Sequence, residues 1–406
     1  MNQKEQLQEK LKEIDRILRD TYQDHTEIGV LSGISGLALF QFYYGKLLGE
    51  ESNTDVGAEM LSLVIQKINE GYSYHTFCTG ISGAAWAMEL LKQEGFIDLD
   101  TDALFSELDD FLVASMERTQ SEIVFYDFLH GSIGVGYYFL KRYQNTQSAV
   151  LKTRYKKILL RIVAALDESA QKDSETARWE SFLIKEDGLR GFNLSLSHGI
   201  SSIINFLSRL VIYDDFYTEV KDLLQQSVRY VLSLKSIDTS STSAFPNWVT
   251  LESEKSDNTR LAWCYGDLGV GLSLWKAGKA LNNISLSETA IAVLVHSTQR
   301  RDLAEAKVID AGLCHGTFGI MHIYNYMYTE TQEVAFKEAA DFWMQEALNM
   351  AVHKNGHAGY MQWKAGETNG WKKESNLLEG IAGIGLSIIS YLAPFDTQWD
   401  ECLLMS

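Results

Sequence analysis

A short motif that begins with glycine recurs seven times along the chain and constrains its fold more than any other feature. Six copies read G-x-x-G, the fourth ends in Ser202, and an apolar run of helical length follows each copy. Consecutive copies lie between 47 and 68 residues apart. Self-similarity at such a period indicates a repeat architecture in which one supersecondary unit is copied. The first glycines of the motifs are Gly33, Gly80, Gly131, Gly199, Gly266, Gly316 and Gly380.

Each repeat carries the pattern of two helices. Residues 80–91 are small and apolar throughout, which predicts a helix buried on all sides, whereas residues 151–166 have the stripe of an amphipathic helix. The chain of 406 residues has only 2 prolines, which favours helix throughout. Such helices can form an open solenoid or a closed ring, and a ring accounts better for inner helices without a polar face. We therefore expect an all-α fold, an α/α toroid of seven inner and seven outer helices, as a single domain over residues 1–406.

The composition excludes several classes of protein. The formal net charge of −18 argues against a nucleic-acid-binding role, which calls for a basic patch. The 4 cysteines have no framework spacing and predict reduced thiols. Residues 1–20 have no apolar core typical of a signal peptide, and no apolar run reaches the length of a membrane span. We expect a cytoplasmic protein.

In a toroid all seven inner helices begin at one end, so the residues just before each first glycine converge on one mouth. These positions hold three of the four cysteines and three of the nine histidines. One residue before each first glycine stand Ser32, Thr79, His130, His198, Tyr265, His315 and Glu379. Two residues before stand Leu31, Cys78, Leu129, Ser197, Cys264, Cys314 and Leu378. Residues 236–259 and 353–376, which we expect to be irregular, lead into motif turns and would rim the cleft.

Cys264, Cys314 and His315 have the composition of a catalytic zinc site. The two cysteines occupy equivalent places in adjacent repeats, and His315 follows Cys314 directly. Two Cys and one His leave a fourth coordination position for water or substrate. Buried thiols and a core histidine are the alternative interpretation. We interpret Cys78 as a buried thiol because it lies three repeats away, and His322 as filling the ring interior.

The segments WCYGDLG from Trp263 and GLCHG from Gly312 resemble the two zinc motifs of the lanthionine synthetase C family. Tyr126-Asp127 and Ser197-His198-Gly199 resemble the family as well, and the likeness covers essentially the whole chain. The resemblance implies zinc held by Cys264, Cys314 and His315. It also implies that the metal is surrounded by Asp127, His198, Arg260 and Tyr265. The alternatives are a core histidine at 198, a structural ion pair at 127 and 260, and simple packing at 265.

The resemblance implies a zinc-dependent lanthipeptide cyclase that adds a cysteine thiolate to dehydroalanine or dehydrobutyrine and forms a thioether ring. His198 would protonate the enolate, Asp127 would hold its tautomer, and Arg260 or Tyr265 would stabilise the enolate oxygen. The partners would be a dehydrated precursor peptide and a separate dehydratase. The alternatives are a member that adds glutathione to dehydrated proteins, a protein prenylation enzyme, and a zinc-bearing scaffold that only binds peptides.

Overall fold

The computed structural model describes residues 2–119, 126–184, 187–238, 241–256, 259–365 and 370–406. Fifteen α-helices make up most of these residues, which confirms the expected all-α class. The chain forms two compact units. The first unit consists of Met1–Thr101 and Val308–Ser406, and the second of Asp102–Lys307.

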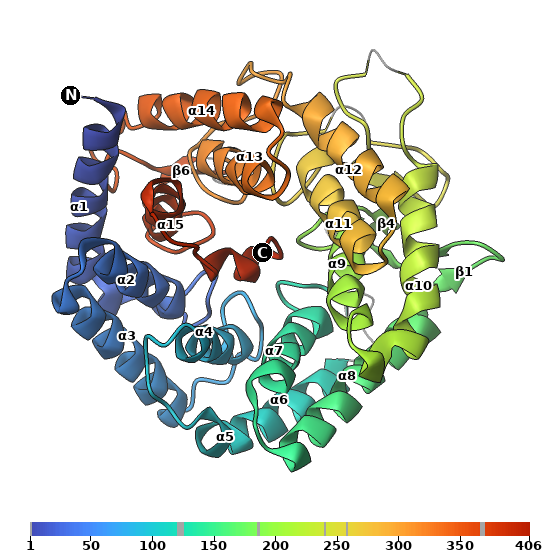
Figure 1. Cartoon of the computed structure of the whole chain (residues 1–406), viewed down its shortest axis with the longest axis horizontal. Coiled ribbons are helices and arrows are strands. Elements are labelled where there is room, and N and C mark those ends of the chain that lie inside the picture. The colour runs from blue at the N-terminus through green and yellow to red at the C-terminus, as the bar shows by residue number, and fades with distance from the viewer. Residues whose placement is uncertain (1, 120–125, 185–186, 239–240, 257–258, 366–369) are drawn as a thin grey trace. The chain divides into compact units, whose positions relative to one another are not determined.

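Each of the seven glycine motifs begins a buried helix, as the repeat predicts. The first glycine of each motif is the residue directly before that helix. Nearly every side chain of these helices is buried, because their residues are small or apolar on all faces. In the first unit the buried helices are α2 (Ile34–Leu48), α4 (Ile81–Gln93), α13 (Thr317–Thr331) and α15 (Ile381–Leu392). In the second unit they are α7 (Ser132–Asn145), α9 (Ile200–Val211) and α11 (Asp267–Ala280) (Figure 1).

A second, amphipathic set of helices covers the buried set. These helices bury one apolar stripe and turn most of their charged residues to solvent, which is the pattern of a helix on a core surface. In the first unit α3 packs on α2, α14 on α13, and α1 on α15; in the second, α8 packs on α7, α10 on α9, and α12 on α11. The covering helices of the first unit are α1 (Gln3–Thr21), α3 (Glu51–Asn69) and α14 (Val334–Asn349). Those of the second are α6 (Ser106–Thr119), α8 (Ala149–Ser169), α10 (Asp214–Ser233) and α12 (Ile284–Ser297).

Three short helical segments complete the described helices. They are the α-helix α5 (Thr101–Leu104) and the 3₁₀ helices η1 (Tyr22–Asp24) and η2 (Trp399–Leu403). No helix in the described part of the chain is long and apolar enough to cross a membrane.

The loops that precede the buried helices share one local structure. In five of them the backbone N–H of the first glycine donates to the carbonyl oxygen four residues earlier, at 2.9–3.1 Å. Within the first unit these loops also bond to one another in series. Cys314 N–H donates to the Leu378 carbonyl (2.9 Å), Leu378 N–H to Leu31 (2.8 Å), and Leu31 N–H to Cys78 (3.2 Å). Four loops that are far apart in sequence are thereby joined side by side.

The second unit joins two of its loops in the same way. Leu196 N–H donates to the carbonyl oxygen of Cys264 at 3.0 Å. The loop that carries His198 is thereby held beside the loop that carries Cys264 and Tyr265.

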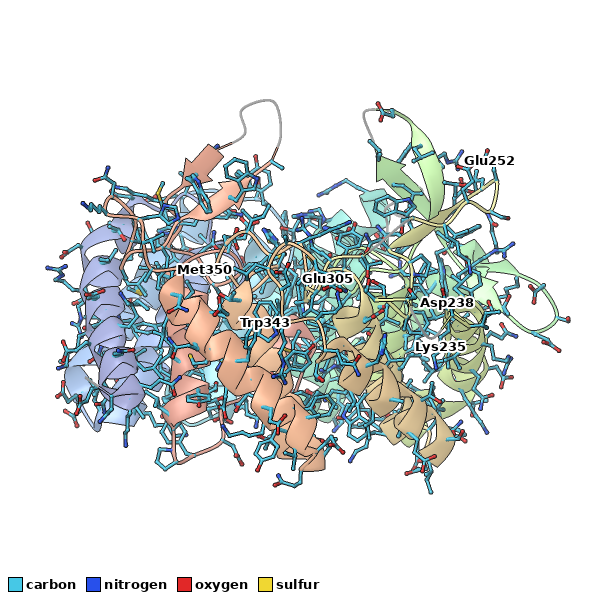
Figure 2. All side chains as sticks on the ribbon, turned by 90° about the horizontal axis from the view of Figure 1, so that it is seen from above. Lys235, Asp238, Glu252, Glu305, Trp343 and Met350 are labelled. Atoms are coloured by element: carbon cyan, nitrogen blue, oxygen red, sulfur yellow. The ribbon has the colours of Figure 1, made fainter. Side chains whose placement is uncertain are left out.

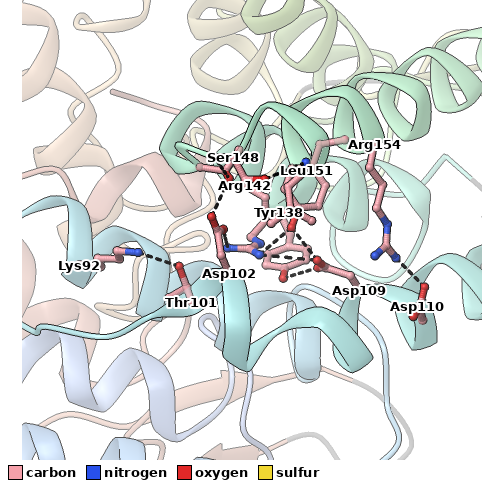
Figure 3. Close-up of polar contacts among 12 residues, drawn as sticks. Lys92, Thr101, Asp102, Asp109, Asp110, Tyr138, Arg142, Ser148, Leu151 and Arg154 are labelled. Atoms are coloured by element: carbon pink, nitrogen blue, oxygen red, sulfur yellow. Dashed lines mark hydrogen bonds and ion pairs between the residues drawn. The ribbon is translucent and has the colours of Figure 1, made fainter.

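A buried ion network fixes α6 to α7 and α8 in the second unit (Figure 3). The Arg142 side chain is fully buried; its guanidinium lies 3.1 Å from Asp102 and 3.6 Å from Asp109, and it donates to the Tyr155 hydroxyl at 2.6 Å. The hydroxyls of Tyr138 and Tyr155 both donate to the Asp109 carboxylate at 2.7 Å. A charge this deeply buried is tolerated only when it is paired and hydrogen-bonded, so these contacts specify how the three helices pack.

Short antiparallel strands are inserted between the helices. Residues 236–259 and 353–376, expected to be irregular, contain three of them, so that expectation is wrong in part. Strand β5 pairs with β4, which lies more than fifty residues earlier, and a pairing over that distance leaves no local sequence signal. Figure 2 labels Glu252, in the turn directly after β5, and Lys235 and Asp238, just after the end of α10 in the same unit. The strands are β1 (Gln171–Lys172), β2 (Ala177–Arg178), β3 (Glu180–Ile184), β4 (Leu189–Asn193), β5 (Trp248–Thr250), β6 (Gln362–Lys364) and β7 (Gly370–Lys372).

Substitution of Gly83, the second glycine of its motif, tests the packing of the motif turns. A Cβ atom on Gly83 would overlap the carbonyl oxygen of Phe77, which belongs to the backbone and cannot swing aside. We expect Gly83→Ala to lower the free energy of unfolding by about 1–3 kcal/mol, the usual cost of overpacking. Chemical denaturation measures it. Gly370→Ala is the matched control, because a Cβ there meets no atom within 4 Å. Equal stability of the two variants would contradict the packing argument.

Candidate active site

Asp127 and His198 form a close pair in the second unit. The Nδ1 atom of His198 lies 2.6 Å from Oδ2 of Asp127, and the Asp127 side chain is only 11% exposed. The other oxygen, Oδ1, accepts the backbone N–H of His130 at 2.8 Å. Both carboxylate oxygens are therefore occupied, and His198 keeps its Nε2 atom free of Asp127. This is the arrangement in which a carboxylate orients an imidazole and leaves the far nitrogen for chemistry.

The position of Asp127 follows from the motif turn. Asp127 stands four residues before Gly131, and its side chain accepts the N–H of the residue one before that glycine. Ser195 does the same for His198 (2.9 Å), Asn376 for Glu379 (2.8 Å) and Thr76 for Thr79 (3.3 Å). Side chains of Asp, Asn, Ser and Thr favour such local bonds to the backbone. Four repeats thus use one turn, and in one of them the turn residue is a carboxylate.

Tyr265 and Cys264 lie in the loop next to His198. The hydroxyl of Tyr265 accepts a hydrogen bond from Asn193 Nδ2 at 3.1 Å. Asn193 Oδ1 in turn accepts the backbone N–H of Ser195 at 2.9 Å. This network fixes Tyr265 relative to the His198 loop. The repeat gives no signal for Asn193, which stands six residues before Gly199, whereas Ser195 is signalled by its place four residues before Gly199.

Arg260, the fourth residue implied to surround the metal, is half-buried and stands four residues before Cys264 in the same loop. Its carbonyl oxygen packs against Gly266, where a Cβ atom would overlap it. Gly266 has φ +84°, a conformation that favours glycine. The structure therefore places Arg260 at the base of the turn that presents Cys264 and Tyr265.

The pKa values in this cluster reflect burial and the Asp127 charge. Burial would lower the pKa of His198, but the hydrogen bond and charge of Asp127 outweigh it and raise that pKa above its usual value, with a smaller contribution from Cys264. Burial raises the pKa of Tyr265, which stays a neutral donor. His130, whose ring lies 6.2 Å from that of His198, has a pKa lowered by burial.

In the first unit Cys314 and His315 stand directly before α13. The Cys314 loop is held by its backbone bond to Leu378. His315 is 20% exposed, and its Nε2 atom lies 3.4 Å from Oδ2 of the buried Asp310. Asp310 also accepts the backbone N–H groups of Gly312 (3.1 Å) and Trp363 (3.0 Å). The repeat gives no signal for Asp310, because this residue stands six residues before Gly316, outside the turn position that the repeats share.

The remaining residues singled out by their sequence lie in the core of the first unit. Cys78 is buried, as expected, with its Sγ atom 3.2 Å from Ser32 Oγ. None of the four cysteines forms a disulfide. His322 is buried within α13, where its Nε2 atom lies 2.9 Å from Oδ2 of Asp400 and its ring packs on Trp399.

The pairing of Asp127 with His198 predicts a pH effect. In Asp127→Asn the carboxylate no longer favours the imidazolium, so burial dominates and the pKa of His198 falls. NMR titration of the imidazole measures it. The wild-type pair should stabilise the fold fully below pH 6.5, and this contribution should be lost as the pH rises through the raised folded-state pKa. His25, in the other unit, should titrate as before; an unchanged His198 titration would contradict the assigned pairing.

Comparison with known proteins identifies the family. Residues 24–404 match the family model described as lanthionine synthetase C-like protein. Among solved structures the chain is similar to nisin cyclase, with a TM-score of 0.73 and 16% identity over 98% of this chain and 97% of that one. This similarity shows a shared fold, the α/α toroid class expected from the repeat.

Two sugar enzymes are more distant. D-mannose isomerase gives a TM-score of 0.42 with 10% identity, over 66% of this chain and 71% of that one. Cellobiose 2-epimerase from Bacillus thermoamylovorans B4167 gives 0.43 with 11% identity, over 89% and 88%. Similarity at this level bears on neither the fold nor the function of the chain. The match over nearly the whole sequence, together with the nisin cyclase fold, shows that the chain belongs to the lanthionine synthetase C-like family.

Proposed function

We propose that this protein is a zinc-dependent lanthipeptide cyclase, which joins a cysteine thiol of a dehydrated precursor peptide to a dehydroalanine or dehydrobutyrine of the same peptide. The observation that carries the proposal is the 2.6 Å contact between Asp127 and His198, beside the loop of Cys264. An imidazole whose orientation is fixed by a carboxylate is suited to transferring a proton.

The donor set supports a zinc ion. Cys264 of the second unit, with Cys314 and His315 of the first, would supply two thiolates and one imidazole. Two thiolates and one imidazole match the ligands of catalytic zinc sites, in which the fourth position stays open. When bound, zinc would supply a Lewis acid that keeps the substrate thiol deprotonated at neutral pH.

The residues of the second unit supply the rest of the reaction. The thiolate sulfur bonds to the β-carbon of the dehydroamino acid, and the electron pair of the double bond moves to form an enolate. His198, whose pKa is raised, delivers a proton from Nε2 to the α-carbon, and Asp127 holds the ring for this transfer. The Tyr265 hydroxyl, which accepts from Asn193, keeps its own proton to donate to the enolate oxygen, and Arg260 is the second candidate for that role.

The partners follow from the chemistry. The reaction adds S–H across a double bond and has no leaving group, so an enzyme that dehydrates Ser or Thr must act first. Four cysteines without a disulfide fit a reducing compartment, and we therefore propose that the protein acts in the cytoplasm.

The proposed activity is tested with a dehydrated peptide that contains cysteine. Cyclisation should leave the peptide mass unchanged and remove one alkylatable thiol for each ring, which mass spectrometry after alkylation counts. A second reaction contains glutathione and a dehydrated peptide without cysteine. Addition of glutathione there, with no ring closure in the first reaction, would assign the protein to the intermolecular reaction instead. Binding without either product would indicate a scaffold.

The metal ligands are tested by elemental analysis. The wild-type protein should hold about one zinc per chain, and Cys264→Ala should lose most of it, because two ligands remain. Cys78→Ala and Cys402→Ala are matched controls, since both remove a buried thiol outside the ligand set and should retain zinc. Retention of zinc by the first variant, or its loss from the controls, would contradict the assigned ligands.

The role of His198 is tested separately from metal binding. His198→Ala should keep its zinc, while its cyclisation rate above the uncatalysed rate should fall by roughly two to four orders of magnitude, the usual value of a positioned acid or base. Asp127→Asn should show a smaller loss, because Asp127 acts through the imidazole. Loss of zinc from His198→Ala would make His198 a ligand, and a full rate would assign the proton transfer to another group, with His130 the next residue to replace.

A further inference from the structure

Asp310 is a buried carboxylate with three partners in the first unit, and the ligand set proposed above does not include it. Its side chain is 1% exposed. Oδ1 accepts the N–H of Gly312 at 3.1 Å, whereas Oδ2 accepts the N–H of Trp363 at 3.0 Å and lies 3.4 Å from Nε2 of His315. Burial of a charge is costly unless its oxygens are hydrogen-bonded, and here both are.

The two backbone donors fix the direction of the carboxylate. Gly312 belongs to the turn that leads into Cys314, and Trp363 belongs to β6. Because these N–H groups come from two separate segments, rotation of the side chain would break at least one bond. The oxygen beside His315 is therefore held in place independently of the imidazole.

This placement determines which nitrogen of His315 is available. A carboxylate oxygen 3.4 Å from Nε2 favours the tautomer with the proton on Nε2, and that tautomer leaves the lone pair of Nδ1 available. A histidine that binds a metal usually donates its other N–H to a carboxylate or carbonyl, which fixes the tautomer and raises the basicity of the ligating nitrogen. Asp310 has the position and the charge for that function.

We infer that Asp310 is a positioning residue for His315, which fixes its Nε2–H tautomer and thereby tightens zinc binding. The inference rests on the proposed function, since it requires His315 to be a ligand. Asp310 contributes to affinity through His315 and takes no part in the proton transfer assigned to Asp127 and His198.

The first measurement is the zinc dissociation constant of the full chain, determined by competition with a chromogenic chelator. Asp310→Asn should weaken binding by roughly 10–100-fold, the usual effect of removing such a partner of a metal ligand. Asp400→Asn is the matched control. It disrupts the buried pair of Asp400 with His322 in the same unit and should leave zinc affinity unchanged. Thermal melting of both variants reports their stability.

A double-mutant cycle separates positioning of the imidazole from general support of the loop. In a His315→Cys background the ligand has no ring to orient, so Asp310→Asn should no longer weaken zinc binding. If Asp310→Asn is insoluble, Asp310→Ser replaces it. A serine can keep the turn bond to Gly312, as Ser236 does for Asp238, but it cannot reach His315.

The outcomes are distinct. Unchanged zinc affinity in Asp310→Asn, or an equal loss in Asp400→Asn, would overturn the role of Asp310 and leave the proposed function intact. The same loss in the His315→Cys background would also overturn it, because the effect would then not pass through the imidazole. A wild-type protein that binds no zinc would overturn the proposed function and this inference together.

Discussion

Contact between a glycine and a backbone carbonyl, repeated along the chain, is the constraint on which the rest of the structure depends. The second glycine of the motif packs on the carbonyl oxygen of the residue six positions earlier, and any side chain would overlap that oxygen. This holds at Gly36, Gly83, Gly319 and Gly383 in the first unit and at Gly269 in the second. The loop before each of these helices is therefore folded back onto the helix start, and further glycines within the helices, such as Gly271 against Leu294 and Gly385 against Phe40, allow close packing on neighbouring helices.

Once the turn is fixed by glycine, the residues inside it are free to vary. In five loops the backbone bond from the first glycine to the carbonyl four residues earlier forms with different side chains between them, and each loop then presents its last residues at a defined place. Five of the loops therefore keep this backbone bond while carrying Ser32, Thr79, His130, His198 or His315 at equivalent positions. The chemistry of the site arises from substitution within a repeated structural frame, which agrees with the concentration of cysteine and histidine there.

The repeated backbone of the turns could be predicted from the sequence, whereas the contacts between distant segments could not. The glycine repeat predicted the seven buried helices, their order and the loops where the candidate residues lie. Asp127 and Ser195 were open to prediction as well, since both occupy the turn position four residues before a glycine. Asn193 and Asp310 were not, because each stands six residues before the first glycine of its motif, outside that turn position, and their bonds to Tyr265 and Trp363 join distant segments. Hydrogen bonds between segments far apart in sequence carry no period, so the repeat does not reveal them.

The identity of the turn residue decides which repeat can support acid–base chemistry. Thr76, Ser195 and Asn376 each satisfy the turn with one oxygen, and none of them carries a charge. Asp127 satisfies the same turn with Oδ1 and has Oδ2 left, with its negative charge, for His198. Burial strengthens that interaction, since little solvent screens a carboxylate that is 11% exposed. The backbone fixes the turn position, and an aspartate there, in place of Ser, Thr or Asn, adds a second, charged oxygen. Where a neighbouring loop presents a histidine, as at His198, that oxygen can orient the imidazole for proton transfer.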